Sequence, residues 1–125
     1  MRVHVCFVQN DLMSHETKTI TDGIGLLNEG HLLYTEDETG AKHSISFGPE
    51  EIVLERIAEV SSRTVLRSGS SGECVVKSPY GDMIFTTKLQ KREMNEACWK
   101  IHYVIFSGQE QISEMELVWE FQKLA

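Results

Sequence analysis

The sequence is short of cysteine, proline and basic residues, and each shortage excludes a class of protein or structure. Its 125 residues include three cysteines, two prolines, and 12 basic against 19 acidic residues, which leaves a formal charge of −7. Because an odd number of cysteines cannot pair completely, the chain is not built on a disulfide framework. Because phosphate binding needs a basic face, we expect neither nucleic acid nor an anionic membrane surface as its main partner.

Long apolar runs are also absent. No run approaches the roughly 18 apolar residues of a membrane-spanning helix. The N-terminus, Met1–Gln9, alternates apolar and polar residues, whereas a signal peptide needs an unbroken apolar stretch. We therefore expect a cytoplasmic protein that forms one domain, residues 1–125, and buries about two thirds of its unfolded surface. The sequence leaves its oligomeric state open.

Strong catalytic, metal and phosphate-binding motifs are missing as well. The five histidines lack the close spacing of a zinc site, so no metal is predicted. No Gly-x-Ser-x-Gly elbow marks a nucleophile, and no glycine-rich loop leads into Lys-Ser or Lys-Thr. The sequence thus indicates no cofactor and favours a role without catalysis.

The dominant positive signal is a period of two in hydrophobicity. Apolar residues alternate with polar ones in several segments, which is typical of strands with one buried face. The apolar positions of these segments form the predicted core: Val3, Val5, Phe7, Ile45, Phe47, Leu54, Phe85, Trp99, Ile101, Tyr103, Leu117, Trp119 and Phe121.

Turn-forming residues separate these segments at intervals of about 8–20 residues, which is the pattern of an all-β protein with about eight to ten strands. So many antiparallel strands must hide or blunt their edges. The strands are long and almost free of proline, which favours a closed or nearly closed antiparallel barrel over a two-sheet sandwich. The interior of such a barrel is filled by side chains or holds one small ligand.

Two segments carry a competing helical signal. Pro49-Glu50-Glu51, followed by apolar residues at helical spacing, fits a helix with proline in its first turn as well as it fits a strand. Ile112, Met115 and Trp119 also have helical spacing, but the strict alternation over residues 114–121 favours a strand there.

Charged residues interrupt two otherwise apolar segments. If both segments are strands, Tyr34 and Glu36 share one face, and Arg56 shares a face with Ile52 and Leu54. A charge among apolar neighbours is costly unless it is paired, and arginine is the best partner for a carboxylate. These residues predict an Arg56–Glu36 ion pair between strands. The alternatives are a polar anchor that orients a ligand inside a barrel, and plain exposure to solvent.

The order Tyr34-x-Glu36, Glu55-Arg56, Ser78-Pro79-Tyr80-Gly81 and Thr86-Thr87 resembles the YwiB-like family of uncharacterised bacterial proteins. The resemblance extends from about Glu16 to Phe121. It implies a calycin-type barrel, the lipocalin architecture, with no established activity. It also implies a strand rather than a helix over residues 50–60. We further expect Tyr34 and Tyr80 to lie near the same end of the barrel as the Arg56–Glu36 pair.

The sequence departs from the family pattern at two places. Val76 and Ser78 stand where the family has tyrosine and threonine, and Ile57 and Ala58 stand where a glycine closely follows the arginine. These departures concern the polar lining of a pocket more than the fold.

Two hypotheses for function follow. The first is a non-enzymatic module that binds a small, partly apolar molecule in the barrel or at its mouth. The second is a solidly packed barrel that acts through its surface as an interaction or regulatory subunit. A small hydrolase or isomerase is a third alternative. An interior cavity would separate the first hypothesis from the second, and titratable groups clustered around that cavity would favour the third.

Overall fold

The computed structural model describes residues 1–124. All the regular secondary structure in that range is β-strand. The ten strands are β1 Arg2–Asp11, β2 Glu16–Asn28, β3 His31–Thr35, β4 Lys42–Phe47, β5 Glu51–Ile57, β6 Ser61–Arg67, β7 Ser71–Ser78, β8 Gly81–Met94, β9 Cys98–Ser107 and β10 Glu110–Lys123.

The strands form a closed barrel. Each strand pairs antiparallel with the next one along the chain, and β1 closes the barrel by pairing with β10, where Phe7 lies opposite Trp119. Closure gives every strand two neighbours, although the first parts of β2 and β8 pair on one side only. The predicted all-β closed barrel is therefore confirmed, with ten strands.

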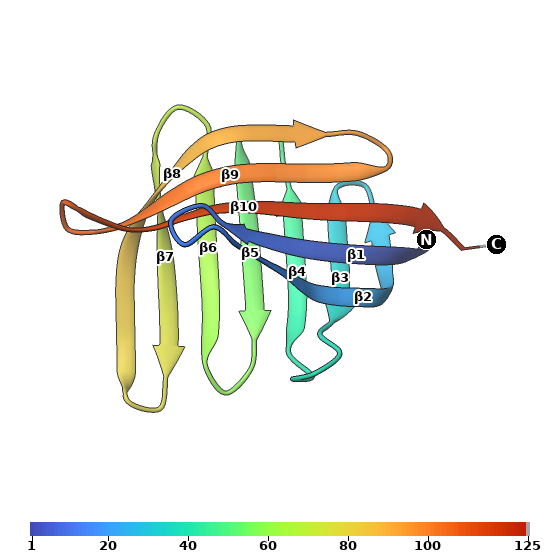
Figure 1. The fold of residues 1–125 in the computed structure, drawn as a ribbon, viewed down its shortest axis with the longest axis horizontal. Helices are drawn as coiled ribbons and strands as arrows, with labels where there is room; N and C mark the ends of the chain where they lie inside the picture. Colours follow the sequence, from blue (N-terminus) through green and yellow to red (C-terminus); the bar gives the residue numbers. More distant parts are fainter. Residues whose placement is uncertain (125) are drawn as a thin grey trace.

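The barrel is built from strands that run in two directions (Figure 1). Strands β3–β7 run nearly perpendicular to β1, β9 and β10, and β8 bends from the first direction into the second. The bend accompanies a register shift between Leu89 and Lys91, where an extra residue is inserted opposite β9. Strand β8 can therefore pair with β7 through its first half and with β9 through its second half.

A second irregularity marks the corner between β6 and β8. Gly72 of β7 lies between these two strands. Beside it, the hydroxyl of Thr87 on β8 donates a hydrogen bond of 2.6 Å to the carbonyl oxygen of Val65 on β6. Only a glycine leaves room for this close approach, because a Cβ on Gly72 would overlap that carbonyl oxygen.

The inward positions of the strands meet in one core. Its aromatic centre is Trp99, whose ring centroid lies 5.0 Å from that of Phe47 and 5.0 Å from that of Phe121. Trp119 stacks on Phe7 with their ring centroids 4.8 Å apart. All five of these side chains were predicted core residues, and all are buried.

Two core predictions and one helical alternative need correction. Phe85 is only half-buried and lies outside the core, because the β7–β8 hairpin extends beyond the strands that cross the barrel (Figure 1). Leu54 is also half-buried, although it packs against the core. The helix considered over residues 50–60 is wrong, because strand β5 occupies residues 51–57. The strand favoured over residues 114–121 is confirmed, because β10 contains Ile112, Met115 and Trp119.

Candidate functional site

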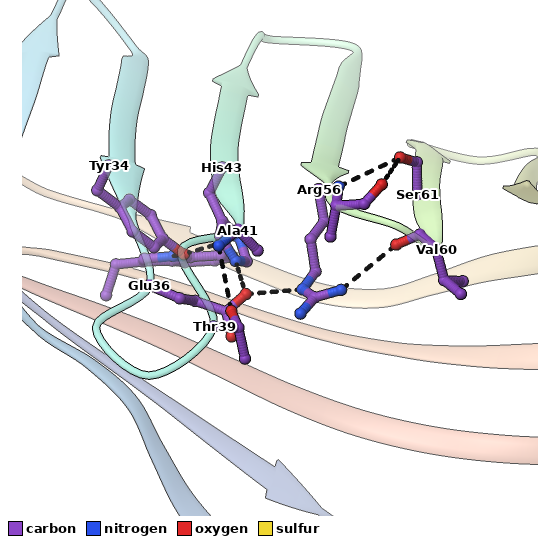
Figure 2. Close-up of polar contacts among 10 residues, drawn as sticks. Tyr34, Glu36, Thr39, Ala41, His43, Arg56, Val60 and Ser61 are labelled. Carbon is purple, nitrogen blue, oxygen red and sulfur yellow. Dashed lines mark hydrogen bonds and ion pairs between the residues drawn. The ribbon is translucent and has the colours of Figure 1, made fainter. Parts of the chain in front are cut away.

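Three of the four predicted site residues meet inside the barrel near the β3–β4 loop (Figure 2). Tyr34 of β3 lies directly opposite His43 of β4, and His43 lies opposite Arg56 of β5. These three side chains therefore form one row across neighbouring strands. Glu36, which directly follows β3, extends toward the same row, and its backbone N–H donates to the carbonyl oxygen of Ala41 across the loop.

A continuous chain of hydrogen bonds links the row to the core. The indole N–H of Trp119 donates to the Tyr34 hydroxyl at 3.1 Å, and that hydroxyl lies 3.2 Å from Nδ1 of His43. Nε2 of His43 lies 2.6 Å from Oε2 of Glu36, and Nε of Arg56 donates to the same carboxylate oxygen at 2.7 Å. One arrangement satisfies every partner: Tyr34 donates to Nδ1, and a neutral His43 donates from Nε2 to Glu36.

The electrostatics agree with that arrangement. Burial lowers the pKa of His43 below its ordinary value, and this effect exceeds the opposing influence of the Glu36 carboxylate. Burial alone would raise the pKa of Glu36, but hydrogen bonds and charge from Arg56 and His43 outweigh it, and the net shift is downward. Burial raises the pKa of Tyr34, so its hydroxyl remains protonated. The ion pair is thus Arg56 with Glu36, bridged to an uncharged histidine.

The structure places Tyr80 apart from this cluster. Its side chain is 99% exposed at the β7–β8 turn, with no hydrogen bond to the other site residues among residues 1–124. A turn at the tip of a hairpin has no neighbouring strand to cover it, which explains the exposure. Tyr34, Glu36 and Arg56 are brought together, and Tyr80 is not.

Sequence reasoning missed His43 and Trp119 as members of the cluster. His43 alternates with Ile45 and Phe47, both predicted as core, so its inward direction was available from the pattern. Trp119 was recognised only as a core residue. Its hydrogen bond to a tyrosine 85 positions away depends on the closure of the barrel.

An open cavity of about 360 Å³ lies beside the cluster, inside the barrel. Arg56 and His43 form part of its wall, and Trp119 forms another part. Its remaining wall combines apolar side chains with hydroxyl, amide and carboxylate groups: Phe7, Gln9, Asp11, Ile45, Leu54, Glu55, Ser62, Thr64, Tyr103, Ile105, Ser113, Met115 and Leu117. A cavity of this size and mixed lining is in the range of small-molecule sites.

Two buried hydroxyl groups also line the cavity. Thr64 donates its hydrogen to the sulfur of Cys74 at 3.3 Å. Tyr103 is only 8% exposed, and its hydroxyl has no hydrogen-bond partner among residues 1–124. Burial raises the pKa of Tyr103, so this group remains an O–H donor.

Metal ligands are not gathered in this region. Across residues 1–124 there is no group of three or more His, Cys, Asp or Glu side chains arranged to hold a metal ion. Two other histidines each pair with a single carboxylate, His4 with Asp22 and His102 with Glu114, both at 2.6 Å. Helices long and apolar enough to span a membrane are absent from the same residues.

The cluster makes stability depend on pH. The folded state holds the pKa values of His43 and Glu36 below their ordinary values of 6.5 and 4.5, so the unfolded chain binds more protons as the pH falls. We expect stability to decline as the pH falls below about 6.5, and to decline further below about 4.5. The measurement is urea unfolding of wild type and of His43→Gln from roughly pH 7 to 5. The free energy of unfolding should fall less steeply with falling pH in the variant than in wild type. An identical slope in both proteins would contradict the assignment to His43.

The fold and site define a class of protein: a closed antiparallel β-barrel with a partly polar cavity at one open end. The chain belongs to the family described as "Domain of unknown function (DUF1934)", whose model matches residues 7–118. It is also similar to the crystal structure of the ywiB protein from Bacillus subtilis, with a TM-score of 0.62 and 19% sequence identity. That alignment covers 98% of this chain and 91% of the other, and it shows a shared fold. No curated protein matches the sequence.

Proposed function

We propose that this protein binds a small, partly apolar molecule in the cavity, without catalysing a reaction. The observation that carries the proposal is the open cavity of about 360 Å³ beside the Arg56–Glu36 pair. A barrel that acted only through its surface would need no such space, and side chains could fill it. The empty volume therefore favours the binding role over the alternative of a solidly packed interaction subunit.

Arg56 is suited to anchor a ligand in this cavity. Its Nε is bound to Glu36, and Nη1 makes a long contact of 3.5 Å with the carbonyl oxygen of Val60. The guanidinium group carries five N–H donors, so several remain for a ligand. Because Glu36 holds the arginine from one side, the free donors are fixed in position before the ligand arrives, which lowers the entropic cost of binding.

Titratable groups beside a cavity also suit a small hydrolase or isomerase, but the geometry favours binding. Both ring nitrogens of His43 are already engaged, one with Tyr34 and the other with Glu36. A general base must reach the proton that it removes, at about 2.6–3.2 Å. His43 could reach a substrate only after one of these hydrogen bonds broke.

The test is native mass spectrometry of protein purified from its own host, compared with a variant whose cavity is filled. Leu54→Trp adds bulk to the cavity wall, and Ile84→Trp adds the same side chain to the exposed outer face of β8. We expect wild type and Ile84→Trp to retain a small molecule, and Leu54→Trp to lose at least about tenfold in occupancy. Circular dichroism verifies that both variants keep the β-sheet spectrum. Equal retention by Leu54→Trp, or no retained molecule in any of the three proteins, would overturn the proposal.

A further inference from the structure

We infer that the ligand of this cavity is uncharged and presents an acceptor oxygen, such as an amide or ketone carbonyl, to the hydroxyl of Tyr103. The inference rests on the proposed function and specifies the chemical class of the ligand. Two independent observations lead to it: one hydroxyl that has no partner, and the balance of charge around the cavity.

The first observation is the Tyr103 hydroxyl. The side chain is more than nine-tenths buried, it lines the cavity, and its hydroxyl has no hydrogen-bond partner within residues 1–124. The hydroxyl is not sealed from water as the unpartnered Oγ1 of Thr21 is, so it is reached from the cavity. A ligand that fills the cavity displaces the water there and must replace its hydrogen bond, because polar groups are rarely buried without a partner. Since burial also raises the pKa of Tyr103, the group offers a hydrogen and requires an acceptor.

The second observation is the charge of the lining. Arg56 is the only lysine or arginine among the cavity-lining residues of the described chain, and Glu36 already neutralises it at 2.7 Å. Asp11 and Glu55 add two further carboxylates to the wall. An anionic ligand would therefore enter a region of net negative charge, where like charges repel.

A cationic ligand is also poorly matched. Asp11 already accepts hydrogen bonds from the backbone N–H groups of Met13 and Ser14, at 3.0 and 3.1 Å. Glu55 lies 3.9 Å from Arg63 and is substantially exposed to solvent. The buried part of the wall is apolar apart from the hydroxyl groups of Thr64 and Tyr103 and the indole N–H of Trp119, which is donated to Tyr34. None of these groups carries a negative charge, so desolvating an ammonium group there would be costly.

Three probes with the same aromatic ring test the inference: benzamide, benzoate and benzylamine. Calorimetric titration at neutral pH should show that benzamide binds at least about tenfold more tightly than either charged probe. Tyr103→Phe removes only the hydroxyl and should weaken benzamide binding about fivefold to tenfold, which is the effect of one neutral hydrogen bond. The matched control, Tyr80→Phe, removes an exposed hydroxyl and should leave the affinity unchanged.

Failure of the inference differs from failure of the proposed function. Tightest binding by benzoate or benzylamine, or equal benzamide affinity in wild type and Tyr103→Phe, would overturn the inference while a cavity ligand remained. Absence of saturable binding by all three probes would also overturn it. The proposed function is judged separately, by the molecule that wild type retains from its host and Leu54→Trp loses.

Discussion

Gly72→Ala is expected to destabilise the barrel by about 3 kcal/mol or to prevent folding, as overpacking does when the neighbouring atoms cannot move. The added methyl group would overlap the backbone carbonyl oxygen of Val65 and lie 2.7 Å from Oγ1 of Thr87. Neither neighbour can yield easily, because Thr87 is held to that carbonyl by a buried hydrogen bond. Relief requires β6 to separate from β8, which opens the corner of the barrel.

Urea unfolding monitored by circular dichroism measures this effect. Gly23→Ala is the matched control, since its methyl group would meet only Oδ1 of Asp37 at an ordinary contact distance of 3.4 Å. We expect Gly23→Ala to change stability by less than about 1 kcal/mol. If Gly72→Ala does not fold, Thr87→Val provides a second measurement. It leaves the Val65 carbonyl without its partner and should cost about 1–3 kcal/mol. Wild-type stability in Gly72→Ala would contradict the close approach at this corner.

Arg56→Met is expected to destabilise the protein by about 2–3 kcal/mol, because it leaves the Glu36 carboxylate buried without its cation. The Glu36 side chain is only 10% exposed, so water replaces the arginine only in part. The loss should be smaller than the full effect for a completely buried pair, since the Arg56 side chain is 35% exposed. His43 also continues to donate to the carboxylate.

A second substitution distinguishes a stranded charge from lost packing. Glu36→Gln combined with Arg56→Met removes the uncompensated charge and should recover part of the lost free energy of unfolding. Arg63→Met is the matched control, because Arg63 is 54% exposed and lies 3.9 Å from Glu55. We expect it to cost no more than about 1 kcal/mol. An unchanged unfolding midpoint in Arg56→Met would show that the pair contributes nothing to the fold.

The candidate site was partly accessible from the sequence. A charge placed among apolar neighbours needs a partner, and this argument alone links Arg56 to Glu36. The same alternation pointed His43 inward, but strand pairing was needed to place it between Tyr34 and Arg56. Tyr80 shows the limit of family resemblance. It belongs to the same sequence motif as Tyr34, Glu36 and Arg56, but it lies at the tip of a hairpin and does not contact them.

Local chemistry determined the strands, their buried faces and the all-β class, because the two-residue period and the turn residues act over a few positions. Tertiary structure decided the rest. Closure brought Trp119 to Tyr34, the corner of β6, β7 and β8 made Gly72 indispensable, and the crossing of the strands left Phe85 half-covered. The cavity is also a property of the tertiary structure alone. The alternation of residues indicates which side chains face inward, but not whether their volumes fill the enclosed space.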